Sequence, residues 1–226
     1  MDKFAKKIGV EFSNKDLLLE ALTHRSYLNE HRGEKVAHNE RLEFLGDAVL
    51  ELVVTTHLFD NYENPEGELT SWRSALVNGE MLAEVGEGLD IGSFLRMSKG
   101  ESQDTGRARR YLIANAVEAV IGAIYLDQGY EAAQDFIEKY IIVNLQEVLD
   151  NNLFTDPKSY FQEKAQEEEK ITPVYKLIKE WGPDHDKHFK IGVYLGSELV
   201  AEGEGISKQD AQREAAKMGL DVKNWN

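Results

Sequence analysis

The sequence predicts an all-α unit over residues 1–150, a linker at 151–156 and a small α+β unit over 157–226. In the first part, apolar residues recur at the spacing of amphipathic helices. Residues 189–195 instead alternate apolar with polar or small residues, as a half-buried strand does. Between these patterns, residues 150–157 contain Asp, Asn and Pro and break the periodicity. The second unit is expected to have the order α-β-β-β-α.

The first unit is expected to consist of helices separated by short breaks. The 111–126 segment is apolar nearly all round, which predicts a buried central helix, and Gly129 is suited to end it. Asn39 is suited to be the N-cap of the helix expected at 39–59. The helices are expected at residues 16–22, 39–59, 68–86, 111–126 and 132–149, with loops at 29–38, 61–67 and 99–110. The core-facing stripe of 39–59 is expected at Leu42, Leu45, Val49, Leu52 and Val53.

The second unit is expected to pair two helices with a three-stranded sheet. Gly196 and Ser197 are typical of a two-residue type II′ hairpin turn. Ser207 and Asp210 have the character of a capping box, which predicts the start of the last helix. The first helix is expected at 158–169 and the strands at 174–178, 189–195 and 199–202.

Composition and charge narrow the classes of protein that fit. The absence of cysteine excludes disulfides and thiolate metal sites and favours a reducing, cytoplasmic location. No apolar run is long enough to span a membrane, the N-terminus does not resemble a signal peptide, and no membrane association is expected. The formal net charge of −15 argues against a general nucleic-acid binder, because phosphate binding uses Lys and Arg.

Four carboxylates fall on one face of the helix expected at 39–59. At about 100° per residue, Glu40, Glu43, Asp47 and Glu51 lie within an arc of roughly 80°. Like charges at this spacing repel one another. A solvated acidic face is the simplest interpretation of such a pattern.

Two features favour a site over a solvated face. Phe44 lies on the acidic side, where packing in the core gives it no place. Asn115 and Glu118 are the strongly polar interior residues of the 111–126 helix, and they share one face. A buried carboxylate needs a hydrogen bond, a cation or a metal. A salt bridge to a core Arg would also satisfy Glu118, but the acidic line in the same unit favours the metal.

The expected ligands are oxygen atoms, with no Cys and no His in ligand spacing. Such a set favours Mg²⁺ or Mn²⁺ over zinc. Carboxylates holding Mg²⁺ are typical of phosphodiester chemistry, in which the ion activates water and stabilises the leaving oxygen. The acidic site would then meet phosphate through the metal, which answers the objection from net charge. A non-catalytic metal site is the alternative.

An ordered set of segments resembles bacterial ribonuclease III over nearly the whole chain. In the first unit these are HNERLEFLGD at 38–47, ALTHRSY at 21–27, PEGELT at 65–70, RSALV at 73–77 and VEAVIGAIYLD at 117–127. The second unit is similar to a double-stranded-RNA-binding domain, through DPKS at 156–159, GPDHDK at 182–187 and GEGISK at 203–208.

The resemblance implies an endonuclease domain followed by an RNA-binding domain. It implies cleavage of double-stranded RNA by a homodimer, in which each protomer cuts one strand. The expected products carry a 5′-phosphate, a 3′-hydroxyl and a short 3′ overhang. Roles in ribosomal RNA maturation and in messenger and other RNA processing follow by family analogy.

The resemblance also implies roles for individual residues of the acidic site. Glu43 and Glu118 match metal-binding glutamates, Asp47 matches a catalytic residue, and Glu40 matches a supporting acid. Phe44 matches a residue that inserts into the partner subunit. We therefore expect Asp47, Glu118 and Glu40 to be catalytic, and the metal ligands to be Glu43, Asn115, Glu118 and Asp47.

Asn115 departs from the family pattern, which usually has Asp at this position. An amide oxygen can still ligate Mg²⁺ or hold a metal-bound water, but it brings no charge. Three interpretations follow: a natural variant with retained activity, an engineered knock-down, and a protein that binds duplex RNA but cleaves it slowly or not at all. We favour the first, because the other acids are intact. A phosphohydrolase acting on small molecules fits less well, because of the C-terminal unit.

The family pattern places duplex RNA contacts at three parts of the second unit. Duplex RNA is read mainly through its shape, its phosphates and its 2′-hydroxyls. Gln209 stands where the family often has a second Lys, so only modest phosphate affinity is expected. The expected contact residues are Gln162, Glu163, His185, Ser207, Lys208 and Lys217.

Overall fold

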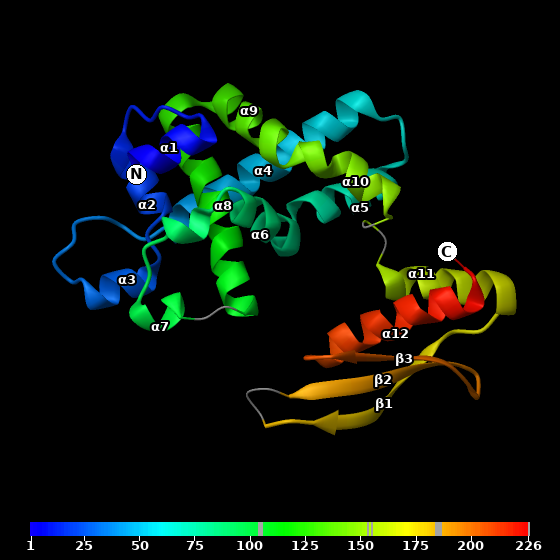
Figure 1. Ribbon diagram of the computed structural model, residues 1–226. Coiled ribbons are helices and arrows are strands. Elements are labelled where there is room, and N and C mark those ends of the chain that lie inside the picture. Colours follow the sequence, from blue (N-terminus) through cyan, green and yellow to red (C-terminus); the bar gives the residue numbers. More distant parts are fainter. Residues whose placement is uncertain (104–105, 153, 155, 184–186, 226) are drawn as a thin grey trace. The chain divides into compact units, whose positions relative to one another are not determined.

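The computed structural model describes residues 1–103, 106–152, 154, 156–183 and 187–225 (Figure 1). The chain divides into two compact units, Met1–Phe154 and Thr155–Asn226. Each unit has its own hydrophobic core. The predicted fold class is confirmed: the first unit is helical, and the second has the order α-β-β-β-α.

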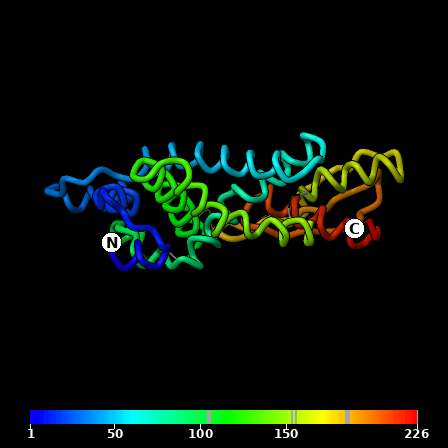
Figure 2. Tube along the Cα trace, turned by 90° about the horizontal axis from the view of Figure 1, so that it is seen from above, coloured from blue at the N-terminus to red at the C-terminus, as the bar shows by residue number. Residues whose placement is uncertain are grey.

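Unit 1 is built around two long helices, α4 (Glu40–Asn61) and α8 (Arg107–Gln128). Figure 2 shows α4 along its full length, in blue to cyan. As predicted, the middle of α8 is buried, from Ile113 to Ile124 apart from the half-buried Asn115 and Glu118, and Gly129, with φ of 88°, follows its last residue. The other helices are α1 (Asp2–Ile8), α2 (Lys15–Ala21), α3 (Arg25–Glu30), α5 (Glu66–Val77), α6 (Gly79–Gly88), α7 (Lys99–Ser102), α9 (Tyr130–Tyr140) and α10 (Leu145–Asp150), with 3₁₀ turns at Ile91–Ser93 and Ile142–Asn144.

Three predicted segments of unit 1 are corrected by the structure. The helix expected at 68–86 is two helices, because the side chain of Asn78 accepts the backbone N–H groups of Glu80 and Met81 and caps α6. The helix expected at 132–149 is interrupted by the 3₁₀ turn at Ile142–Asn144. The loop expected at 99–110 contains α7, which Ser98 caps, and the start of α8.

The buried stripe of α4 is wider than predicted and centred elsewhere. Leu42, Val49 and Val53 are buried as expected, but Leu52 is 55 % exposed and its prediction is wrong. Leu45 is half-buried. The buried face instead centres on Gly46 and continues through Leu50, Val54 and Leu58. Gly46 was missed because the prediction considered only large apolar residues.

Unit 2 packs two helices against one face of a three-stranded antiparallel sheet of order β1-β2-β3. Its elements are α11 (Pro157–Lys164), a π-helical turn (Ala165–Glu169), β1 (Val174–Trp181), β2 (His188–Leu195), β3 (Glu198–Gly205) and α12 (Lys208–Lys223). The core joins both helices to β2 and β3 through Phe161, Val193, Leu195, Val200, Ala215, Ala216 and Leu220.

The turn and the cap predicted in unit 2 are present. Gly196 has φ of 60° in the connection between β2 and β3. Ser207 is the N-cap of α12, and its Oγ accepts the N–H of Asp210 at 3.1 Å. The strands are longer than expected: β1 continues to Trp181, β2 begins at His188, and β3 begins at Glu198 and continues to Gly205. The helix α11 gives way to the π-helical turn before residue 169. Among the described residues of the whole chain, no helix is long and apolar enough to cross a membrane.

Candidate active site and RNA-binding surface

The acidic face of α4 meets α8 where the two backbones come closest. A methyl group built on Gly46 would overlap the carbonyl oxygen of Glu118, and one built on Gly122 would overlap the carbonyl oxygen of Leu42. Only hydrogen atoms fit at these two positions. The crossing therefore sets the first turns of α4 beside the middle of α8, on which Asn115 and Glu118 lie.

The predicted metal and catalytic residues influence one another at this crossing. Burial, together with the negative charges of Asp47 and Glu43, raises the pKa of Glu118 to about 8. Burial also raises the pKa of Glu43, with Glu40 and Asp47 adding to it, while a hydrogen bond from Asn115 acts in the opposite direction. The structure thus brings Glu43, Asp47, Asn115 and Glu118 together.

The members of this site differ in their exposure. Glu43, Asn115 and Glu118 are half-buried, whereas Asp47 is exposed. Glu40 is exposed at the start of α4, with Oε1 3.4 Å from Arg25 Nη1 and Oε2 3.7 Å from His38 Nδ1. In the part of the chain that the structure describes, no group of three or more His, Asp or Glu side chains is already placed as a metal site. The carboxylates are close enough to repel but are not converged on one point.

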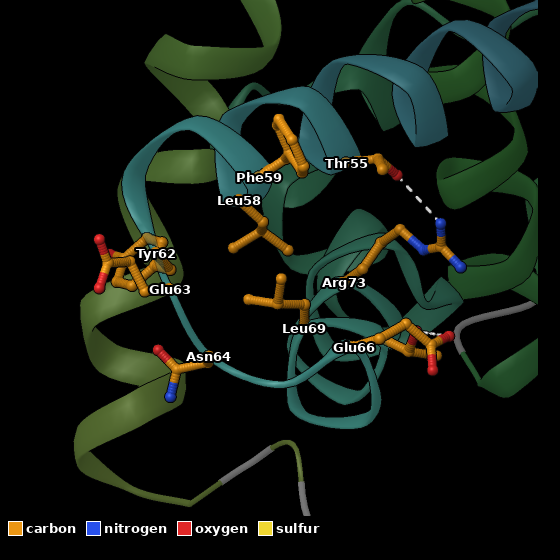
Figure 3. Close-up of a pocket in the computed structure, with 10 residues that line it drawn as sticks. Thr55, Leu58, Phe59, Tyr62, Glu63, Asn64, Glu66, Leu69 and Arg73 are labelled. Atoms are coloured by element: carbon orange, nitrogen blue, oxygen red, sulfur yellow. Dashed lines mark hydrogen bonds between the residues drawn. The ribbon is translucent and has the colours of Figure 1, made fainter.

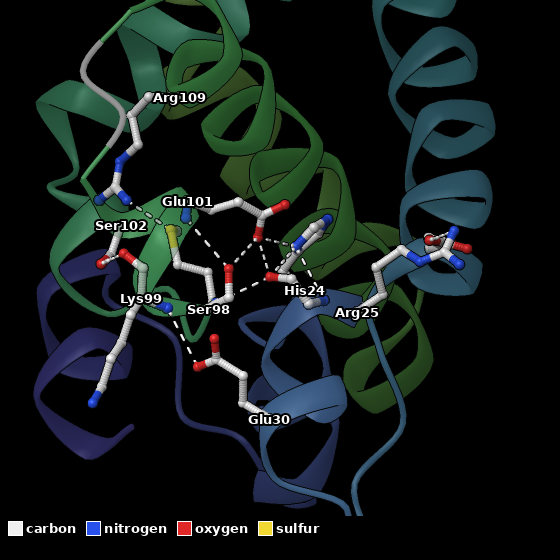
Figure 4. Close-up of polar contacts among 11 residues, drawn as sticks. His24, Arg25, Glu30, Ser98, Lys99, Glu101, Ser102 and Arg109 are labelled. Atoms are coloured by element: carbon white, nitrogen blue, oxygen red, sulfur yellow. Dashed lines mark hydrogen bonds and ion pairs between the residues drawn. The ribbon is translucent and has the colours of Figure 1, made fainter.

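A hydrogen-bonded cluster near the start of α4 was not predicted from the sequence (Figure 4). Nδ1 of His24 lies 3.0 Å from Oε2 of Glu101, and Ser26 Oγ donates to the same oxygen. Ser26 Oγ also accepts the N–H of Ser98 at 3.0 Å. Burial would raise the pKa of Glu101, but the hydrogen bond from Ser26 and the charge of His24 lower it. The segment ALTHRSY, which contains His24 and Ser26 and resembles the family, was the one sequence feature that could have pointed to this cluster.

A separate hollow lies at the other end of α4 (Figure 3). Its volume is about 650 Å³, and it lies between the last turns of α4 and the first turns of α5. Arg73 Nη1 donates to Thr55 Oγ1 at 3.0 Å at its edge. Since 16 residues of helix separate Glu43 from Phe59, about 24 Å lie between the carboxylates and this hollow. Its apolar lining includes Leu58, Phe59, Tyr62 and Leu69.

The residues expected to contact RNA lie on the helices of unit 2. Gln162 and Glu163 are exposed on α11. Gln162 and Gln209 line one hollow between α11 and α12, so the first turns of these helices present a common surface. His185 lies outside the described residues.

Ser207 and Lys208 stand at the N-terminus of α12, where the helix dipole favours anions. Lys217 is exposed but lies nine residues beyond Lys208, which puts it about 13 Å further along the axis and on the opposite side of the helix. The structure therefore does not bring Lys217 together with Ser207 and Lys208.

Comparisons with known proteins match both units. Residues 14–145 match a family model described as ribonuclease-III-like, and residues 157–223 match the double-stranded RNA binding motif. Ribonuclease 3 of Borreliella burgdorferi is 42 % identical over 97 % of this chain and 90 % of its own length. Ribonuclease 3 of Clostridium perfringens is 43 % identical over 95 % of this chain and 90 % of its own length.

A solved structure of the nuclease domain of ribonuclease III from Campylobacter jejuni is also similar. It is 40 % identical, covers 63 % of this chain and 96 % of its own, and gives a TM-score of 0.57. That structure is described as showing flexibility in a region involved in dimer formation.

Proposed function

The chain belongs to the ribonuclease III family, and from this premise we propose that it is an endoribonuclease that cleaves double-stranded RNA. The observation that carries the proposal is the crossing of α4 and α8, which places Glu43, Asp47 and Glu118 beside Asn115. The double-stranded RNA binding motif of unit 2 supports the choice of substrate. The expected products have a 5′-phosphate, a 3′-hydroxyl and a short 3′ overhang, and ribosomal RNA precursors are the expected class of natural substrate.

A divalent cation fits the residues of this site. The donors are carboxylate and amide oxygens, which Mg²⁺ or Mn²⁺ prefers. Burial is the main cause of the raised pKa of Glu118, and repulsion by Asp47 and Glu43 adds to it. A cation held by these residues and Asn115 would relieve that repulsion. When bound, the ion supplies a positive charge for the phosphate and lowers the pKa of a water molecule.

The side chains of this site would carry out the other steps, which are proton transfer and the positioning of reacting groups. Asp47 and Glu40 are exposed, so we assign them to proton transfer and to support of the attacking water. Glu43 and Glu118 are half-buried on facing helices, which suits them to fixed positions. Asn115 donates a hydrogen bond to Glu43, so its amide orients a carboxylate as well as offering an oxygen.

Cleavage of a long RNA duplex tests the proposal. The protein is expected to cut the duplex with Mg²⁺ and not with EDTA, and mapping both ends is expected to show 5′-phosphates and short 3′ overhangs. Asn115→Asp should change the rate without creating an activity that the natural chain lacks. If the natural chain binds the duplex without cutting it while Asn115→Asp cuts it, the chain is a non-cleaving or slow-cleaving RNA-binding dimer.

A homodimer is supported by the exposed side of α4. Phe44 is 80 % exposed, Leu52 55 % and Phe59 77 %, and their spacing of eight and seven residues places them along one stripe. In a two-fold interface, a contact from one residue to a second residue of the partner is matched by the reciprocal contact. Antiparallel pairing of two α4 helices would bring Phe44 of one protomer to the apolar hollow at the other end of the partner's helix. We therefore propose that α4 forms the dimer contact.

A further inference from the structure

The segment at residues 22–26 is bonded on two sides, to Arg96, which precedes α7, and to Asn39, which precedes α4, and we call it the strut. On one side, Arg96 N–H donates to the carbonyl of Leu22 at 2.8 Å, and His24 N–H donates to the carbonyl of Arg96 at 2.9 Å. On the other side, Asn39 N–H donates to the carbonyl of Thr23 at 2.9 Å. Thr23 is thereby fixed to Asn39, the residue that precedes α4, while Leu22 and His24 on either side of it are fixed to Arg96.

The strut reaches the acidic residues by two routes. Arg25, which is labelled in Figure 4, forms an ion pair with Glu40, with 3.4 Å between Arg25 Nη1 and Glu40 Oε1. The carbonyl of Asn39, whose N–H is held by Thr23, accepts the N–H of Glu43 at 2.9 Å. The pKa of Glu43 is raised, mainly by burial and by Glu40, and His24 acts in the opposite direction, which agrees with the proximity of His24 and Glu43. A shift of the strut would therefore move the first turn of α4 and the carboxylates on it.

Glu101, which lies on α7, binds the strut through its carboxylate. Its Oε2 contacts both His24 Nδ1 and Ser26 Oγ, while its own N–H donates to Ser98 Oγ, the cap of α7, at 3.3 Å. The His24 side chain is only 17 % exposed, so its ring is enclosed. A carboxylate on one ring nitrogen fixes the orientation of an imidazole.

We propose that Glu101 and Ser26 are positioning residues for the acidic site, acting through His24 and the strut at 22–26 on Glu40 and Glu43. They do not touch the substrate. Their contribution is to hold the first turn of α4 at the distance from α8 that the proposed cation requires. The inference rests on the proposed function, because it concerns the same site.

The test compares Glu101→Gln with a matched carboxylate elsewhere in unit 1. Asp127 also joins two distant segments, since its two side-chain oxygens accept the N–H groups of Ser13 at 2.8 Å and Asn14 at 2.7 Å. Asp127→Asn therefore removes a comparable clamp that has no link to α4's first turn. Both variants are measured for Tm, for the kcat and KM of duplex cleavage, and for the Mg²⁺ concentration that gives half of the maximal rise in Tm.

Glu101→Gln is expected to lower kcat by about tenfold, because small displacements of reacting groups are costly. The KM for duplex RNA should stay within about twofold, and the Mg²⁺ concentration for half-maximal stabilisation should rise severalfold. Asp127→Asn should lower Tm without changing kcat or the Mg²⁺ concentration. If Glu101→Gln also changes only Tm, the cluster merely stabilises the fold and the inference is wrong.

Variants of Ser26 keep the test decisive if Glu101→Gln does not fold. Ser26→Ala removes one hydroxyl and should show the same loss of kcat to a smaller extent, whereas Ser26→Thr retains the hydroxyl and should restore it. Equal kcat for both Ser26 variants and the natural chain would overturn the inference. If the natural chain itself fails to cleave duplex RNA, the proposed function fails instead, and the two outcomes are distinguished.

Discussion

The two units build their polar surfaces in different ways. In unit 1, Glu43 and Glu118 lie 75 positions apart in the chain and meet because α4 and α8 cross at two glycines. In unit 2, Ser207 and Lys208 are neighbours in sequence, and their placement follows from one helix cap. A site assembled across a tertiary contact should respond to changes far from its own side chains. A site built on one helix end should respond only to its own residues.

Gly46→Ala should give the largest effect and should be confined to unit 1. The added methyl group would overlap the carbonyl of Glu118, so α4 and α8 must separate. We expect unit 1 to lose about 3 kcal/mol of stability and cleavage to be lost, with duplex binding by unit 2 retained. Differential scanning calorimetry and a binding assay measure the two results. Gly67→Ala on α5 meets open space and serves as the control. If Gly46→Ala had the same Tm as the unmutated chain, the result would contradict the described crossing.

Asp47→Asn should separate cleavage from binding. The change removes a charge from an exposed carboxylate of the acidic site without altering its shape. We expect kcat to fall by about 100-fold, while the Kd for duplex RNA measured in EDTA stays within about twofold. Glu51→Gln, on the same side of α4 but one turn further on, is the control. A Kd that rises in step with the loss of kcat would show that the two units do not divide the work as proposed.

Phe44→Ala should weaken the proposed dimer without disturbing the protomer. Phe44 is 80 % exposed, so its loss leaves no cavity within one chain. We expect a loss of about 2 kcal/mol of association free energy, roughly a 30-fold increase in the dimer Kd. Sedimentation velocity measures it, with Val143→Ala, an exposed apolar residue on the 3₁₀ turn before α10, as the control. Equal dimer stability in both variants would count against α4 as the interface.

Glu118→Gln should gain stability relative to the natural chain as the pH rises. The pKa of Glu118 is about 8 in the folded chain, well above its ordinary value, so the folded state holds a proton that the unfolded state has released. The contribution of the Glu118 carboxyl to the free energy of unfolding is therefore fully present below about pH 4.5 and is lost as the pH rises through 8. In EDTA, the Tm of Glu118→Gln minus that of the natural chain should grow between pH 5 and pH 8. A constant difference would mean that the carboxyl ionises normally.

Lys208→Gln should give the smallest effect and should stay within unit 2. Removing one phosphate contact is expected to weaken duplex binding by about threefold and to make the dependence of log Kd on log salt shallower by about one. Fluorescence anisotropy at several salt concentrations measures both. Lys176→Gln, an exposed lysine on β1, is the control. If both variants lose the same affinity, binding depends on the overall charge of unit 2 and not on the N-terminus of α12.

Sequence reasoning predicted the elements that depend on local rules alone. The apolar α8 with Gly129 after it, the Ser207 cap and the Gly196 turn follow from local rules, and each is present. Segments governed by competing local bonds were less predictable. Asn78 divides a continuous helical pattern, because its side chain accepts the N–H groups of Glu80 and Met81 and so begins a new helix.

The candidate site was predictable as a set of residues but not as an arrangement. The shared face of Glu40, Glu43 and Asp47 follows from helical geometry, as does the pairing of Asn115 with Glu118. Glu101 could not be connected to His24, because the contact joins residues 77 positions apart through a short helix in a segment expected to be a loop. The exposure of Leu52 was also missed, since it depends on where α8 crosses.

The glycine crossing has a consequence for how the molecule opens. With backbones in contact at Gly46 and Gly122, α4 and α8 cannot separate by small side-chain movements, so they should unfold as one cooperative segment. Their amide protons near the crossing should exchange with solvent only when the whole of unit 1 unfolds. The amides of α7, a four-residue helix, should exchange through local opening. Deuterium uptake should then be slow in α4 and α8 near the crossing and fast in α7, although both border the acidic site.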